Sequence, residues 1–304
     1  MGVLVAKAYP TILFAKAADH TYVECGTGRK GWSCWGGKSN GTEITRGVGS
    51  TLRADAIAQS DEKANIKCYL VNGVCHQAAN RILLPAGKLV LNARGYGLSS
   101  SIFGPYGREL IWPCSSPFLQ YPEISGDLPE CIGSSEAIES SVETESAGEE
   151  SLFIQRSLNI YDRAGMSMAA ESGAGEEAMA ETESAMIIEL FNLFVEYRLK
   201  SAVDATKMRE LNSIRKPLEL DIQQNRKEFS KEEKSPLEFV LEFNRLVTEY
   251  QEKMKGLLAP ADYQQLYNVD PTEDAIFLAD PEIVKAAYGV DLLFDHDQNS
   301  DSPH

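Results

Sequence analysis

Residues 67–84, KCYLVNGVCHQAANRILL, decide the expected fold of the N-terminal half. The apolar run Tyr69–Val71 is typical of a short strand, and Asn72-Gly73 directly after it is typical of a turn. From Cys75 onward the apolar residues recur at steps of about three and four, as on one face of a helix, and Pro85 then stops the pattern. The stretch therefore predicts a strand, a tight turn and a helix that begins at a cysteine.

The position of Cys75 is the clearest chemical signal in the chain. A cysteine in the first helical turn lies beside backbone N–H groups that no other residue of the helix satisfies, and at the positive end of the helix dipole. Both effects favour the thiolate, which is the nucleophilic form of cysteine. We therefore expect Cys75 to be more acidic than the other cysteines and to act as a nucleophile.

A histidine is needed to accept the thiol proton. The chain has four histidines, of which His296 and His304 lie in a polar tail. His76 follows Cys75 directly, and neighbouring side chains on a helix point about 100° apart, so His76 is poorly placed. His20 begins a separate predicted strand and could approach the thiol across the fold, so we expect His20 to be the general base. The alternative is that Cys75 is a small buried helix residue and His20 an exposed residue at a loop end.

A second alternative is a zinc site. The candidate ligands are His20, Cys25, Cys34, Cys68, Cys75 and His76. The spacings between these cysteines match no CxxC knuckle, so we predict no metal and no other cofactor. The glycine-rich segment 36–50 also lacks the spacing of a phosphate-binding loop, and no nucleotide is expected.

The formal net charge of −16 and the sequence pI of about 4.8 describe an acidic protein. Contacts to phosphate need clustered Lys and Arg, so we expect neither a nucleic-acid partner nor an anionic membrane surface. No apolar run approaches the ~20 residues that span a bilayer. Met1–Ala18 lacks the basic start of a secretory signal, and we expect the six cysteines to be reduced thiols of a cytoplasmic protein.

Composition divides the chain into three parts. Residues 1–132 hold all six cysteines and mix strand and helix patterns, which predicts an α+β domain. Residues 133–185 are rich in Ser, Glu and Ala and predict an acidic mobile linker, in which only residues 151–161 are apolar enough to dock. Residues 186–304 predict a helical domain with a polar tail. A non-catalytic protein that binds a protein partner at this helical domain is the remaining alternative.

The expected elements follow the local patterns. Strands are expected at residues 3–14, His20–Cys25, Gly31–Trp35 and Lys88–Ala93, with the middle two forming a hairpin. Residues 36–50 predict a loop, Thr51–Lys63 a helix and Gly95–Asp127 an extended surface segment. Later helices are expected from Met186, at Leu211–Ile222 with a kink or break at Pro217, from Ser235, at Ala261–Tyr267 and at Pro281–Tyr288.

The order of these motifs resembles a known family. A strand histidine in HTYVEC (residues 20–25), a hairpin, and later a cysteine at a helix start in YLVNGVCHQAAN (residues 69–80) look like the circularly permuted branch of the NlpC/P60 papain-like superfamily. That branch includes the lecithin:retinol acyltransferase-like proteins, and the resemblance covers about residues 3–130. It implies a cysteine helix packed on a small antiparallel sheet, and thiol peptidase, amidase or acyltransferase activity on a peptide, amide or acyl substrate.

The resemblance also implies roles for single residues. Cys75 attacks a carbonyl, His20 protonates the leaving group, and water or an acceptor amine resolves the thioester. Backbone N–H groups from Val74 to His76, with the Gln77 side chain, would hold the oxyanion. The residue that orients His20 is expected on the strand after it, where the candidates are Ser33 and Cys34, with Asn40 just beyond, which we take as the third catalytic residue. The aromatic residues that would line the cleft, or else pack in the core, are Trp32, Trp35, Tyr96 and Tyr106.

Overall fold

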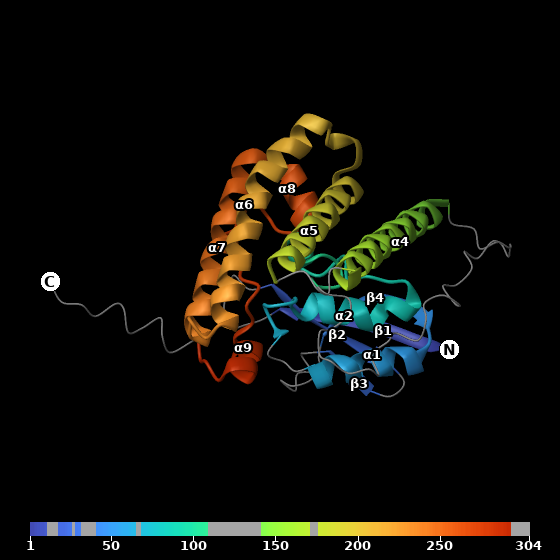
Figure 1. The fold of residues 1–304 in the computed structure, drawn as a ribbon. Helices are drawn as coiled ribbons and strands as arrows, with labels where there is room; N and C mark the ends of the chain where they lie inside the picture. The colour runs from blue at the N-terminus through green and yellow to red at the C-terminus, as the bar shows by residue number, and fades with distance from the viewer. Residues whose placement is uncertain are drawn as a thin grey trace.

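A computed structural model of the chain describes residues 1–10, 18–25, 28–31, 41–64, 68–108, 141–170 and 176–292. An antiparallel sheet with short helices forms the N-terminal part, and long helices follow it, as Figure 1 shows. This arrangement confirms the expected α+β class with a helical C-terminal part.

Within the described residues, four strands form one antiparallel sheet in the order β3-β2-β1-β4. They are β1 (Gly2–Pro10), β2 (Asp19–Cys25), β3 (Gly28–Lys30) and β4 (Thr42–Gly49). On β1 the residues Leu4, Ala6 and Ala8 are buried, while the residues between them are at least partly exposed. This alternation is that of a strand with one face in the core. The second strand of the hairpin, β3, begins earlier than expected, at Gly28 rather than Gly31.

Strand β4 corrects the prediction of a loop at residues 36–50. Glycines dominate that segment in composition, but Thr42–Gly49 pairs with β1 along most of its length. Two of the glycines are required by close packing rather than by a turn. A Cβ on Gly49 would lie 2.6 Å from the Pro85 carbonyl oxygen, and one on Gly47 would lie 3.0 Å from the Ala86 Cβ.

Two predicted strands are wrong. Tyr69–Val71 forms turns, with one isolated bridge from Tyr69 to Gly73. Residues 88–93 are irregular, and side chains accept from two of their amides in place of a strand partner. The Val90 amide donates to Asn80 Oδ1 at 2.8 Å, and the Leu89 amide donates to Glu150 Oε1 at 3.1 Å.

Three helices pack around the sheet in the N-terminal part: α1 (Thr51–Ala64), α2 (Cys75–Leu83) and α3 (Tyr96–Phe103). Helix α2 begins at Cys75 as predicted, packs on β2 and α1, and runs into a 3-10 turn at Leu84–Ala86. Every residue of α2 and α3 is buried. The expected surface segment from Gly95 is therefore a core helix over residues 96–103, and residues 109–127 of that prediction lie outside the described part.

Six helices follow: α4 (Ser141–Ala170), α5 (Glu176–Leu199), α6 (Ala205–Ser230), α7 (Pro236–Leu257), α8 (Pro260–Tyr267) and α9 (Pro281–Tyr288). The predicted helices from Met186 onward are confirmed. Pro217 lies inside a continuous α6 and does not divide it. Ser235 caps α7, since its hydroxyl accepts from the Glu238 amide and the Glu238 carboxylate accepts from the Ser235 amide.

Helix α4 corrects the prediction of a mobile linker at residues 133–185. Residues 141–170 are helical, and α5 already begins at Glu176. The physical reason is a buried stripe through the apolar segment 151–161, where Phe153, Ile154 and Leu158 recur at helical spacing. That segment docks as expected, and it orders the helix around it. The boundary predicted near residue 132 lies outside the described part of the chain.

The end of the helical part packs against the turn that precedes Cys75. The Tyr69 hydroxyl donates to the Leu278 carbonyl at 2.9 Å and accepts from the Asp280 amide at 2.8 Å. The Ala18 amide donates to the Phe277 carbonyl at 3.0 Å. Phe277, Leu278 and Asp280 therefore lie beside the start of α2. None of the helices in the described ranges is long and apolar enough to cross a membrane.

Candidate functional site

Cys75 is the first residue of α2, directly after the N-cap residue Val74. The Gln77 side chain closes this helix start, since its Oε1 accepts from the Val74 amide at 3.0 Å. The amides of Gln77 and Ala78 both donate to the Val74 carbonyl. Cys75 is only 5% exposed, so the helix start faces the interior.

His20 lies on β2 and is paired with a carboxylate from the other end of the chain. Its Nε2 lies 3.1 Å from Asp280 Oδ2, and both side chains are buried. Asp280 is the N-cap residue of α9, and its Oδ1 accepts from the amides of Glu282 at 2.8 Å and Ile283 at 3.2 Å. The two oxygens thus have separate tasks, because Oδ1 caps the helix and Oδ2 holds the imidazole.

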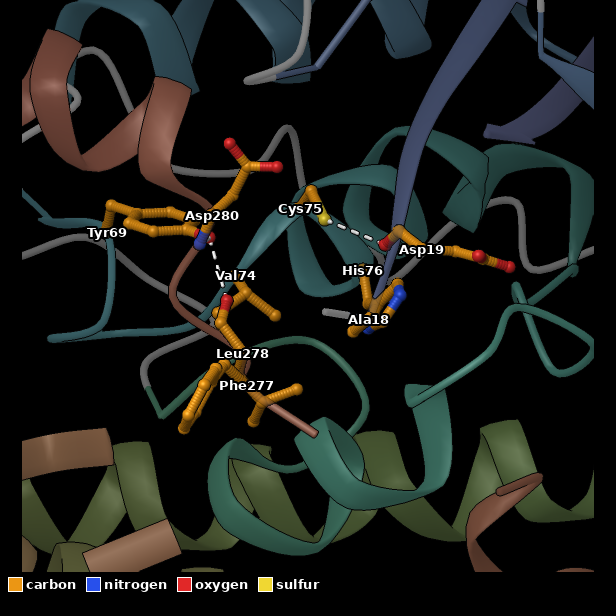
Figure 2. Close-up of a pocket in the computed structure, with 9 residues that line it drawn as sticks. All are labelled: Ala18, Asp19, Tyr69, Val74, Cys75, His76, Phe277, Leu278 and Asp280. Carbon is orange, nitrogen blue, oxygen red and sulfur yellow. Dashed lines mark hydrogen bonds between the residues drawn. The ribbon is translucent and has the colours of Figure 1, made fainter. Parts of the chain in front are cut away.

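The thiol lies against the backbone on both sides of His20. Cys75 Sγ donates to the Asp19 carbonyl at 3.6 Å, as Figure 2 shows. Hydrogen bonds to the backbone and side chain of Thr21 lower the pKa of the thiol. The nucleophile candidate therefore contacts the residues before and after the base candidate on β2.

A small cavity of about 10 Å³ adjoins the thiol. It has room for about one water molecule. Figure 2 shows its walls, which are Ala18, Asp19, Tyr69, Val74, Cys75, His76, Phe277, Leu278 and Asp280. His20 is linked to this cavity through Asp280.

The expected acidity of Cys75 is not what the site produces. Burial raises the pKa of the thiol to about 12, and the Asp280 carboxylate adds to the rise. Hydrogen bonds from Thr21 and the His76 amide lower it, but by less than burial raises it. The helix start does stabilise the thiolate, yet the desolvation of a buried sulfur outweighs this, so the resting group is the neutral thiol.

His76 lines the same cavity as a neutral imidazole. Burial, with a contribution from His20, lowers the pKa of His76 to about 3. Its Nδ1 lies 2.8 Å from Ser99 Oγ, which also accepts from Gln77 Nε2 at 3.2 Å. The ring is therefore fixed between α2 and α3 and carries no charge near neutral pH.

Two of the predicted oxyanion groups are engaged elsewhere. The Val74 amide donates to Gln77 Oε1, and Gln77 Nε2 donates to Ser99 Oγ and to the Gly104 carbonyl at 3.1 Å. Both groups hold the helix start in place. Of the predicted oxyanion donors in the first turn of α2, the backbone amides of Cys75 and His76 remain as candidates.

The two predicted cleft residues that the structure describes, Tyr96 and Tyr106, do not line the cavity. Tyr96 is buried in the core, where its ring packs edge-on against His76 and Phe194, each at 6.0 Å between centroids. Tyr106 is buried against Tyr161. The remaining candidates, Trp32, Ser33, Cys34, Trp35 and Asn40, lie outside the described residues.

The residue missed from the sequence is Asp280. Asp280-Pro281 before an apolar helix is a sequence signal for a helix N-cap, and nothing in that signal points to a histidine nearly the whole chain away. Over the described residues, no group of three or more His, Cys, Asp or Glu side chains is placed to hold a metal ion. Comparisons with protein-family models, with curated proteins and with solved structures found no match to this chain.

Proposed function

We propose that the protein is a thiol-dependent hydrolase or acyltransferase that acts on an amide or ester bond. Cys75 is the nucleophile, His20 the general base and Asp280 the residue that orients His20. The observation that carries the proposal is the buried contact between His20 Nε2 and Asp280 Oδ2. Asp280 lines the same cavity as Cys75, which is the first residue of α2. A buried carboxylate on one ring nitrogen fixes the tautomer and leaves proton transfer to the other nitrogen.

The neutral resting thiol favours general-base activation over a preformed thiolate. The thiol proton passes to His20 Nδ1 as the sulfur attacks the carbonyl carbon, and Asp280 stabilises the imidazolium. The imidazolium then returns the proton to the leaving amine or alcohol, and a thioester remains on Cys75. Water or an acceptor amine attacks the thioester, gives its proton to His20, and the thiol is restored.

The family resemblance supports this proposal in part. A strand histidine before a cysteine that opens a helix on an antiparallel sheet is the arrangement that the permuted NlpC/P60 branch implies. The third residue departs from it, because Asp280 comes from the C-terminal helical part instead of the strand after His20. In the proposed enzyme the helical part is therefore needed for catalysis.

Substitution of Asp280 tests the proposal. Asp280→Asn keeps an N-cap side chain but removes the negative charge, whereas Asp280→Ala removes both. We expect both variants to acetylate Cys75 at least 100-fold more slowly than wild type with p-nitrophenyl acetate, measured by peptide mass spectrometry. Only Asp280→Ala should also lose about 1 kcal/mol of unfolding free energy, since it loses the cap. If Asp280→Asn acetylates at the wild-type rate, Asp280 has no catalytic role and the proposed arrangement fails.

A further inference from the structure

A buried hydroxyl beside His20 has no hydrogen-bond partner among the described residues. Tyr9 on β1 is paired with His20 on β2, so the two side chains leave the same face of the sheet. Their ring centroids lie 5.1 Å apart. The Tyr9 hydroxyl is buried, and no residue in the described part of the chain forms a hydrogen bond with it.

The surroundings place this hydroxyl near the proposed reacting groups. Burial raises the pKa of Tyr9 well above its ordinary value, and the charges of Asp280 and Cys75 raise it further. The phenol ring lies beside His20, whose Nε2 is 3.1 Å from Asp280 Oδ2. It keeps its proton at neutral pH and is a hydrogen-bond donor.

A hydroxyl buried without a hydrogen bond destabilises a fold, because it loses its hydrogen bonds to water and forms none in the protein. The neighbouring Tyr22 shows the usual arrangement. Its ring lies 6.3 Å from that of Tyr9, and its hydroxyl accepts from the Gly41 amide at 3.2 Å. The Tyr9 hydroxyl makes no such hydrogen bond to any described residue, so its proton is available to a bound molecule.

We propose that the Tyr9 hydroxyl donates a hydrogen bond to the substrate carbonyl oxygen and to the oxyanion that forms when Cys75 attacks the carbonyl carbon. This inference rests on the proposed function and supplies a side-chain donor in place of Gln77, whose amide is engaged. As the carbon–sulfur bond forms, the carbonyl π electrons move to oxygen and Tyr9 stabilises the charge without losing its proton. When the leaving group departs, the electrons return and the thioester remains.

Two reagents separate this role from an effect on the thiol itself. p-Nitrophenyl acetate acylates Cys75 through an oxyanion, whereas iodoacetamide alkylates it by displacement at a saturated carbon, which forms none. We expect Tyr9→Phe to slow acetylation of Cys75 by about 100-fold, the usual effect of one lost oxyanion donor. Alkylation of Cys75 should keep its wild-type rate, and the melting temperature should stay unchanged or rise.

The matched control is Tyr22→Phe, which should keep both rates and lower the melting temperature. Equal slowing of both reagents in Tyr9→Phe would place the hydroxyl on the thiol and overturn the inference. Wild-type acetylation in Tyr9→Phe, with Asp280→Asn slow, would overturn the role of Tyr9 alone. If Cys75 is acetylated no faster in wild-type protein than in His20→Ala, the proposed function is overturned as well.

Discussion

At the scale of single residues, burial decides the chemistry of the two ionisable groups at the start of α2. The position of Cys75 was predictable from its sequence context, because an apolar run, a turn and a helical pattern mark the helix start. Its pKa was not predictable, since the desolvation of the sulfur depends on residues 277–280, which pack over it from the far end of the chain. Position came from local sequence, and acidity came from tertiary packing.

The buried neutral His76 makes stability depend on pH. Its folded pKa of about 3 lies below the ordinary value of 6.5, so between these values the unfolded chain binds a proton that the folded chain does not. The free energy of unfolding should therefore fall as the pH drops from 6.5 towards 3 and be insensitive to this group above 6.5. The slope from one such group is at most about 1.4 kcal/mol per pH unit.

Urea unfolding at several pH values between 4 and 7 measures this dependence. His76→Asn, which replaces the imidazole with an amide that does not titrate, is the control. We expect the slope between about pH 4 and 6 to be shallower in this variant by up to about 1.4 kcal/mol per unit. Identical slopes in wild type and variant would show that His76 is not buried as a neutral group.

At the scale of elements, periodicity and caps predicted the C-terminal helices well. The elements that were missed are those whose pattern depends on neighbours. Strand β4 was predicted as a loop because it contains Gly47 and Gly49. These glycines leave room for the backbone and side chains of residues 85–88, which pack closely against the strand. Helix α4 was predicted as a linker because its N-terminal residues are acidic, although an apolar stripe through Phe153 and Leu158 follows them.

The segment 277–280 is held over the thiol chiefly through Tyr69. Its hydroxyl serves both the Leu278 carbonyl and the Asp280 amide, so Tyr69→Phe removes two buried hydrogen bonds at once. We expect a loss of roughly 1–3 kcal/mol in unfolding free energy and faster amide hydrogen exchange in residues 276–282. Tyr263→Phe is the control, since that buried hydroxyl has no hydrogen-bond partner among the described residues. Equal exchange in both variants would mean that Tyr69 does not hold the segment.

At the scale of the whole molecule, a buried ionic network joins the turn before Cys75 to the long helices. The Arg108 amide donates to the Asn72 carbonyl at 2.8 Å, next to the turn that leads to Cys75. The Arg108 guanidinium is held by both oxygens of Glu219 on α6, at 2.5 and 2.9 Å, and by Glu183 on α5. Glu219 also accepts from Arg215 at 2.9 Å. Arg108 of the N-terminal part is thus paired with two carboxylates of the helical part, and these pairs link the two parts.

Removal of Glu219 tests this link. Glu219→Ala leaves Arg108 and Arg215 buried without their shared carboxylate, and we expect a loss of about 3–5 kcal/mol in unfolding free energy. Glu189→Ala, which breaks the exposed pair with Arg163, should change it by less than about 1 kcal/mol. Chemical denaturation of the three proteins measures both effects. Similar values for the two variants would show that the network does not join the halves.

The identity of the nucleophile is tested most directly by acetylation with p-nitrophenyl acetate, followed cysteine by cysteine with peptide mass spectrometry. Cys75 is buried, while Cys25 and Cys68 are partly exposed, so simple access favours the other two. Our account predicts that Cys75 is nevertheless acetylated at least 10-fold faster than either, and that His20→Ala abolishes this preference. Acetylation that follows exposure, with Cys75 the slowest and His20→Ala without effect, would contradict it.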